Sequence, residues 1–301
     1  MAFRLKRSEA LPDGVRRIVR EEIDAAVSEL REAEVDVQKA VHQVRKRCKR
    51  LRGLLRLVQP ALGKRYAIEN KRFRNAGREL SELRDADALR EAFNSLQQCC
   101  KHGKARKTLF AMMDVVERRR AECSLEKSVI AVTLQNVNEL LVDSMNELEV
   151  WKFSRSGWRG LEDGLHASYA SGRKALTTVA TAIPSDTELH QLRKRVKDHW
   201  YHMRLLEGAW PVVMEARSRE IKTLTELLGH DQDLVMVQHV IEESPAIIDA
   251  ADLNEVLARV ISHRRNELQT SAIRLAHRVY AEDADALVAR LRVYWKVWRR
   301  H

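Results

Sequence analysis

Histidine, lysine and arginine recur at helical spacing in residues 41–58, and this part of the sequence is the best suited to chemistry. Five of these residues lie 3, 4, 3 and 4 positions apart and therefore share one helix face: His42, Arg45, Lys49, Arg52 and Arg56. Lys46 lies beside this basic stripe. Arginine offers paired donors to phosphate oxygens, lysine a mobile point charge, and histidine a donor whose charge grows when an anion raises its pKa. The stripe predicts a binding site for a phosphate-rich anion.

The same pattern returns at a constant offset of 148 residues, so that His42 corresponds to His190. The second basic stripe consists of His190, Arg193, Lys197 and Arg204, with Lys194 beside it. Trp200 stands where the first copy has Arg52, which lowers the charge but leaves an aromatic face. A chance match would not keep this register, so the chain is predicted to contain an internal duplication.

Further basic residues follow each stripe at the same offset. The first copy has Lys71, Arg74 and Arg78, spaced 3 and 4 apart, and the second has Arg219, Lys222 and Glu226 in their places. Since the second copy replaces an arginine by a glutamate, we expect the anion track to be stronger on the side of the first copy.

The charge density of the first copy also points to an anionic ligand. Residues 41–65 contain nine lysines or arginines and no aspartate or glutamate. Like charges this dense repel each other, whereas a solvated helix usually mixes both signs. If the two basic helices face each other, their stripes line a groove about 20 Å long, from the rise of about 1.5 Å per residue. A chain of phosphates suits such a groove better than one small ion.

Composition and periodicity predict an all-α fold. Apolar residues follow helical spacing, and only 11 glycines and 5 prolines occur in 301 residues. The offset holds from His42 to Asp85, which predicts two homologous halves, residues 1–150 and 151–301. About four helices per half with short connections predict two antiparallel helical bundles, related by pseudo-twofold symmetry around a basic central channel.

Each basic helix also carries an apolar stripe that predicts its buried side. In the first copy the stripe is Val41, Val44, Cys48, Leu51, Leu55 and Val58, and in the second it is Leu189, Leu192, Val196, Met203 and Leu206. Ser185 and Glu188 have capping-box spacing and predict the start of the second basic helix. We expect the tryptophans at positions 151, 158, 295 and 298 to lie in the core.

The segments HQVRKRCKRLRGLLR and HQLRKRVKDHWYHMR, with LSELRDAD and LLGHDQDL downstream, resemble the CHAD family of histidine-containing α-helical domains. The likeness covers nearly the whole chain and implies one CHAD domain whose basic central channel binds inorganic polyphosphate and directs the protein to polyphosphate granules. The residues that match the binding positions are His42, Arg45, Lys46, Lys49, Arg52, Arg56, His190, Arg193, Lys194, Lys197 and Arg204. Plausible additions from the next helix of each half are Lys71, Arg74, Arg78, Arg219 and Lys222.

Other functions stay open at this point. A nucleic-acid binder would neutralise phosphates with the same helices, although an aromatic content of 5% leaves few base-stacking platforms. A phosphate-processing enzyme would use the histidines or the carboxylate pairs Asp85/Asp87 and Asp231/Asp233. We expect those aspartates instead to end a basic helix, where they cap the next helix or pair with an arginine. No glycine-rich phosphate loop, nucleophile elbow or HExxH motif occurs, so we expect no catalysis, metal or cofactor.

Charge and cysteine usage bear on partners and compartment. A net charge of +11 favours acidic partners. The four cysteines lack the spacing of a disulfide or zinc framework, and neither a secretory leader nor a membrane-spanning apolar stretch is apparent. We expect a cytoplasmic protein whose partners are polyphosphate and granule-associated proteins.

Overall fold

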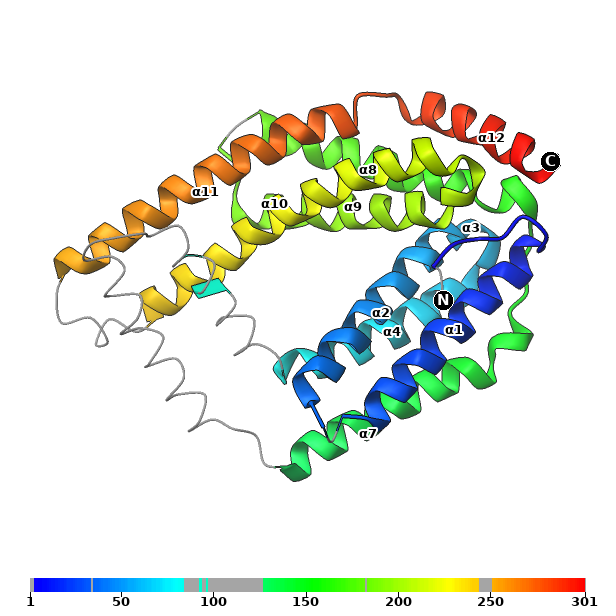
Figure 1. Ribbon diagram of the computed structural model, residues 1–301, viewed down its shortest axis with the longest axis horizontal. Helices are drawn as coiled ribbons and strands as arrows, with labels where there is room; N and C mark the ends of the chain where they lie inside the picture. Colours follow the sequence, from blue (N-terminus) through cyan, green and yellow to red (C-terminus); the bar gives the residue numbers. More distant parts are fainter. Residues whose placement is uncertain are drawn as a thin grey trace.

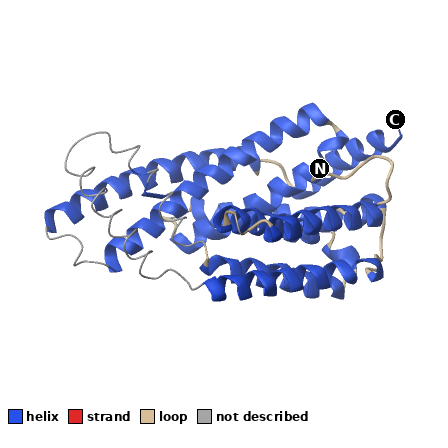
Figure 2. Cartoon of the chain, turned by 60° about the horizontal axis from the view of Figure 1, so that its bottom comes forward, coloured by secondary structure: helices blue, strands red, loops and turns tan. Residues whose placement is uncertain are grey.

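The computed structural model consists of helices and describes residues 3–33, 35–83, 92–93, 96, 127–181, 183–243 and 251–300. The α-helices of this described part are α1 (Leu11–Arg31), α2 (Val37–Leu57), α3 (Gln59–Leu62), α4 (Lys64–Glu82), α7 (Lys127–Asn146), α8 (Glu162–Ala180), α9 (Asp186–Leu205), α10 (Pro211–Glu243), α11 (Ala251–Val279) and α12 (Ala284–Arg300). Three short 3₁₀ helices are η1 (Leu148–Val150), η2 (Gly157–Gly160) and η3 (Glu207–Ala209). The described residues contain no strand, which confirms the predicted all-α class (Figure 2).

The helix that carries the second basic stripe begins where its sequence predicts. The Oγ of Ser185 accepts a hydrogen bond from the Glu188 N–H at 3.3 Å, and the Glu188 carboxylate accepts one from the Ser185 N–H at 2.8 Å. These two bonds satisfy amide groups that the first turn of a helix leaves without partners. The predicted capping box is confirmed, and α9 follows directly from it.

Contacts between helices form two closed rings of four. In the first ring α1 packs against α2 and α7, and α4 packs against the same two helices. In the second ring α8 packs against α9 and α11, and α10 packs against the same two helices, while α12 lies along α8. Figure 1 shows the second set above the first, with α10 and α11 extending beyond it. Each ring can therefore bury an apolar face of all its members.

The two basic helices, α2 and α9, are in direct contact. Gly53 of α2 lies against Tyr201 of α9, so closely that a Cβ atom at Gly53 would lie 2.7 Å from Tyr201 Cδ2. The Nε2 of His202 donates to the Gly53 carbonyl oxygen at 3.0 Å. Gly53 and Tyr201 are separated by the repeat offset of 148, so each meets its own counterpart. The missing side chain at Gly53 permits this approach.

Every residue of the two predicted apolar stripes is buried, from Val41 to Val58 on the first copy and from Leu189 to Leu206 on the second. These residues belong to one large apolar core. Trp151, Trp158 and Trp295 are buried in that core as predicted, and Trp298 packs against it partly exposed.

A second, smaller apolar cluster lies away from the main core. It joins the later part of α10 to α11 and includes Leu234, Val237, Leu257, Ile261 and Leu268. Phe93 and Leu96 pack into the same cluster. Residues that precede position 150 in the chain therefore share a core with α10 and α11.

Candidate polyanion-binding site

Two arginines of α2 are held by carboxylates of α1. Arg47 donates to Glu22 at 3.1 Å and to Glu29 at 2.7 Å, and Arg50 donates to Glu22 at 3.1 Å. Part of the repulsion expected along α2 is therefore relieved by acidic residues that lie on α1, outside residues 41–65. These two arginines fasten α1 to α2, whereas the predicted basic stripe uses other residues.

A first cationic cluster contains side chains from three helices: Arg52 and Arg56 of α2, Arg74 of α4 and Lys194 of α9. Burial lowers the pKa of Lys194, and Arg195, Arg56 and Arg52 lower it further. Burial also lowers the pKa of Arg52, and repulsion from Arg56 and Arg74 lowers it further. Arg52 Nε donates to Asn70 Oδ1 at 3.1 Å. Burial and neighbouring cations therefore disfavour the charges of Arg52 and Lys194.

A second cationic cluster comprises Lys46 and Arg50 of α2 and Arg204 of α9. Burial is the main cause that lowers the pKa of Lys46, followed by repulsion from Arg50 and Arg204. Burial likewise lowers the pKa of Arg204, and Arg50 adds repulsion. The Arg204 guanidinium lies 5.4 Å from the centre of the Trp200 ring. An aromatic face therefore borders this cluster.

The two clusters are related by exchange of the repeats. Lys46 and Arg56 on α2 correspond to Lys194 and Arg204 on α9. Each lysine is repelled by the arginine of the opposite helix, Lys46 by Arg204 and Lys194 by Arg56. Contact between α2 and α9 thus brings predicted site residues of both repeats together in each of the two cationic clusters.

A family model described as the CHAD domain matches residues 17–242, which include α2, α4 and α9. The chain belongs to the CHAD domain family. It is also similar to two proteins of Mycobacterium tuberculosis, each named only as an uncharacterized protein, with 29% identity over 253 residues. The alignment covers 80% of this CHAD chain and 47% of each relative, so the chain spans about half the length of the curated relatives it matches.

Asp198 is a site residue that the sequence did not single out. Its buried carboxylate accepts a hydrogen bond from Arg56 Nη1 across the contact between α2 and α9, and it lies 3.7 Å from Arg195. Burial raises the pKa of this carboxyl, against the opposing effects of Arg56 and Arg195. Asp198 is the only acidic residue in segment 189–206 and replaces Arg50 of the first copy. This change from arginine to aspartate between the repeats is the sequence feature that could have identified Asp198.

His190 is half-buried and held in one orientation. Its Nδ1 lies 3.0 Å from the Gln232 side-chain oxygen, which can only accept, so Nδ1 carries the proton. Burial lowers the His190 pKa, and Lys194, Arg193 and Lys197 lower it further. The ring is therefore neutral at pH 7 in the CHAD domain without an anion. A negative charge placed beside the ring would raise this pKa, and protonation would turn Nε2 into a donor.

The remaining predicted site residues on α2 and α9 are exposed or half-buried. His42 and Lys49 are exposed on α2, and Arg45 is half-buried there. On α9, Arg193 and Lys197 are half-buried, and the Arg193 guanidinium passes close to Gly229 of α10.

The second helices of the two repeats differ in the partners of their basic residues. Lys71, Arg74 and Arg78 are exposed on α4, and none of them forms an ion pair with another described residue. On α10, Arg219 pairs with Glu215 at 3.4 Å and Lys222 with Glu226 at 3.2 Å. Carboxylates of α10 therefore engage two basic residues of the second copy, whereas the three basic residues of α4 have no such partner among the described residues.

The carboxylates considered for catalysis have structural partners where they are described. Asp231 is buried and accepts from Arg265 Nε at 3.0 Å and from Gln269 Nε2 at 2.9 Å, which joins α10 to α11. The predicted pairing with an arginine is confirmed, but the predicted helix end is wrong because α10 continues to Glu243. Asp85 and Asp87 lie outside the described residues. Within the described ranges, no three acidic, histidine or cysteine side chains gather as a metal site would require.

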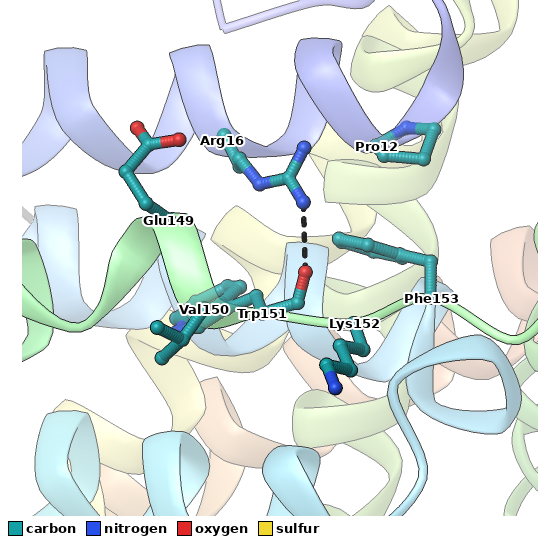
Figure 3. Close-up of a pocket in the computed structure, with 7 residues that line it drawn as sticks. All are labelled: Pro12, Arg16, Glu149, Val150, Trp151, Lys152 and Phe153. Atoms are coloured by element: carbon teal, nitrogen blue, oxygen red, sulfur yellow. Dashed lines mark hydrogen bonds between the residues drawn. The ribbon is translucent and has the colours of Figure 1, made fainter.

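A pocket elsewhere on the molecule has a different character (Figure 3). It lies between the start of α1 and residues 149–153. Arg16 donates to the Trp151 carbonyl oxygen at 2.8 Å and stacks 5.6 Å from the centre of the Phe153 ring. Arg16 therefore holds the start of α1 against the turn at residues 151–153.

Two further expectations concern the thiols and the membrane. Cys48 is a buried free thiol, and burial raises its pKa to about 12, which keeps it protonated. Cys99, Cys100 and Cys123 lie outside the described residues. Among the helices that the structure describes, none is both long and apolar enough to cross a bilayer.

Proposed function

We propose that this CHAD protein binds inorganic polyphosphate along a basic channel beside the contact of α2 with α9, with its two bundles related by a pseudo-twofold axis. The observation that carries the proposal is the reciprocal placement of Lys46 beside Arg204 and of Lys194 beside Arg56. An axis of that kind would also bring Gly53 against Tyr201, its own counterpart.

The fold concentrates positive charge without compensating it fully. Lys46, Lys71, Arg74, Arg78 and Lys194 form no ion pair with any other residue in the described ranges. Burial and then neighbouring arginines lower the pKa of Lys46 and of Lys194. Such repulsion destabilises the folded state, and a bound polyanion relieves it. Binding therefore stabilises the protein as well as holding the ligand.

A polymeric anion fits the arrangement better than a single phosphate. The stripe from His42 to Arg56 runs along about 20 Å of helix, at about 1.5 Å per residue. Both clusters lie beside the contact of α2 with α9, so a chain of phosphates can engage them in succession. We assign the protein a binding role without catalysis, in the cytoplasm at polyphosphate granules.

Nucleic acid is the alternative ligand, because its phosphates would be neutralised by the same cations. Stacking platforms are scarce, however, since Trp151, Trp158 and Trp295 are buried in the core. Trp200 is an aromatic residue beside the clusters.

The experiment that tests the proposal compares two double charge reversals of equal size. Lys46→Glu with Lys194→Glu alters both clusters, while Arg292→Glu with Lys296→Glu alters exposed cations of α12 that form no ion pair with described residues. Labelled long-chain polyphosphate is titrated onto each purified protein. We expect a loss of affinity of tenfold or more, at about 1.4 kcal/mol per tenfold, only in the first variant. Equal losses in both would indicate diffuse attraction to a basic surface.

A further inference from the structure

Trp200 gives the second cationic cluster a ring that stacks on one of its arginines. Its ring lies beneath the Arg204 guanidinium at 5.4 Å and is only partly buried. At the corresponding place in the first repeat, Arg52 points its guanidinium at Asn70, with a hydrogen bond of 3.1 Å. The two ends of the proposed anion track therefore differ, because one adds a cation and the other adds an aromatic face.

Lys46 and Arg204 supply the charge beside this ring. They approach from different helices, each is partly desolvated, and neither forms an ion pair with a described residue. Glu22, the acidic residue near both cations, already pairs with Arg47 and Arg50. Glu207, which also lies near Arg204, is 3.9 Å from Arg4. Two cations with an adjacent indole match a molecule that carries phosphates at one end and a flat aromatic base at the other.

We propose that Trp200, Lys46 and Arg204 form a subsite for a nucleoside polyphosphate, with the base stacked on the indole and the phosphates between the two cations. This inference rests on the proposed polyphosphate site and assigns its second end to a nucleotide. Arg204 moves from the ring to the phosphates as the ligand enters. The base stacks on the face that Arg204 leaves, and Arg204 exchanges its cation–π contact for charge-assisted hydrogen bonds to phosphate, so the exchange is favourable.

The test compares ATP with inorganic tripolyphosphate, which carries the same three-phosphate chain without a base. Calorimetric titration without divalent cations should give about tenfold tighter binding of ATP to the unchanged protein, within the range known for base stacking. Trp200→Ala should remove this preference and leave tripolyphosphate affinity within about twofold, at about 1.4 kcal/mol per tenfold. Trp200→Tyr, which keeps a ring, should retain the preference.

Two further variants sharpen the comparison. Trp200→Arg recreates the arrangement of the first repeat, so it should bind tripolyphosphate more tightly than the unchanged protein and show no preference for ATP. Trp210→Ala removes a tryptophan that is 48% exposed at the start of α10, where it packs against Tyr294, and should leave the preference intact.

The outcomes separate this inference from the proposed function. Binding of long-chain polyphosphate and tripolyphosphate with no preference for ATP would overturn the nucleotide subsite alone. Absence of binding to all three ligands would overturn the proposed function. If an adenine oligonucleotide at equal base concentration displaced ATP more strongly than free ATP does, the ring would serve a nucleic acid, and the assignment to a nucleoside polyphosphate would be wrong.

Discussion

His202 fastens α9 to α2 and should make the fold sensitive to acid. Its ring is fully buried, and its Nε2 donates to the Gly53 carbonyl oxygen at 3.0 Å. Burial lowers its pKa to about 4, against the opposing effect of the hydrogen bond to Gly53. In an unfolded chain a histidine has a pKa of about 6.5. The neutral ring thus stabilises the folded state above that value, and the contribution is lost as the pH falls toward the folded pKa.

The size of the effect follows from these two pKa values. Between pH 7 and pH 5 the unfolded chain takes up about 0.7 of a proton at His202 while the folded protein takes up about 0.1, which costs about 2 kcal/mol of unfolding free energy. His199 is also buried with a lowered pKa and acts in the same direction. His202→Gln replaces the imidazole by an amide that still donates but does not titrate.

Urea unfolding followed by circular dichroism at pH 7, 6 and 5 measures the difference. The stability gap between the unchanged protein and His202→Gln should shrink by about 2 kcal/mol over this range, because only the unchanged protein loses the histidine contribution. His263→Gln, at an exposed position of α11, controls for the loss of a histidine as such. If the unfolding free energies of the unchanged protein and of His202→Gln changed equally with pH, the assignment of His202 as a neutral contact between α2 and α9 would be refuted.

Three other predictions concern the same region. Gly53→Ala should destabilise the fold by about 1 kcal/mol in urea unfolding, since overpacking against Tyr201 exceeds the gain in helix propensity, whereas Gly77→Ala, whose Cβ would meet only Cys48 at 4.0 Å, should stabilise it. Asp198→Asn should cost about 3 kcal/mol in the same assay because it leaves Arg56 without its charged partner, and a neutral effect would contradict that role. Polyphosphate affinity should rise as the pH falls through the histidine range, because the neutral His190 gains a proton on binding, and His190→Gln should flatten this dependence in titrations at several pH values.

Local pattern was sufficient to predict the helices that carry the site. The apolar stripe from Val41 to Val58 is entirely buried, because a helix with one apolar face has one way to remove it from water. The capping box at Ser185 fixed the start of α9 in the same way, since it depends on residues three apart. The offset of 148 residues also marked Trp200 as the place where the two repeats differ.

The local sequence pattern did not predict the contacts between helices. The bond from Arg56 to Asp198 joins residues 142 positions apart, and Glu22 reaches Arg50 from another helix. The predicted helix end at Asp231 was wrong for a related reason. Gly229 is a residue type that often ends helices, but apolar packing of Leu234 against α11 carries α10 onward.

A competition experiment at physiological salt, ~0.15 M, tests the polyphosphate channel most directly. Labelled long-chain polyphosphate is bound to the purified protein and challenged with excess DNA, RNA or orthophosphate. The proposed channel predicts that polyphosphate stays bound against all three and is released by unlabelled polyphosphate. Ready displacement by DNA or RNA would contradict the account and make this CHAD protein a nucleic-acid binder.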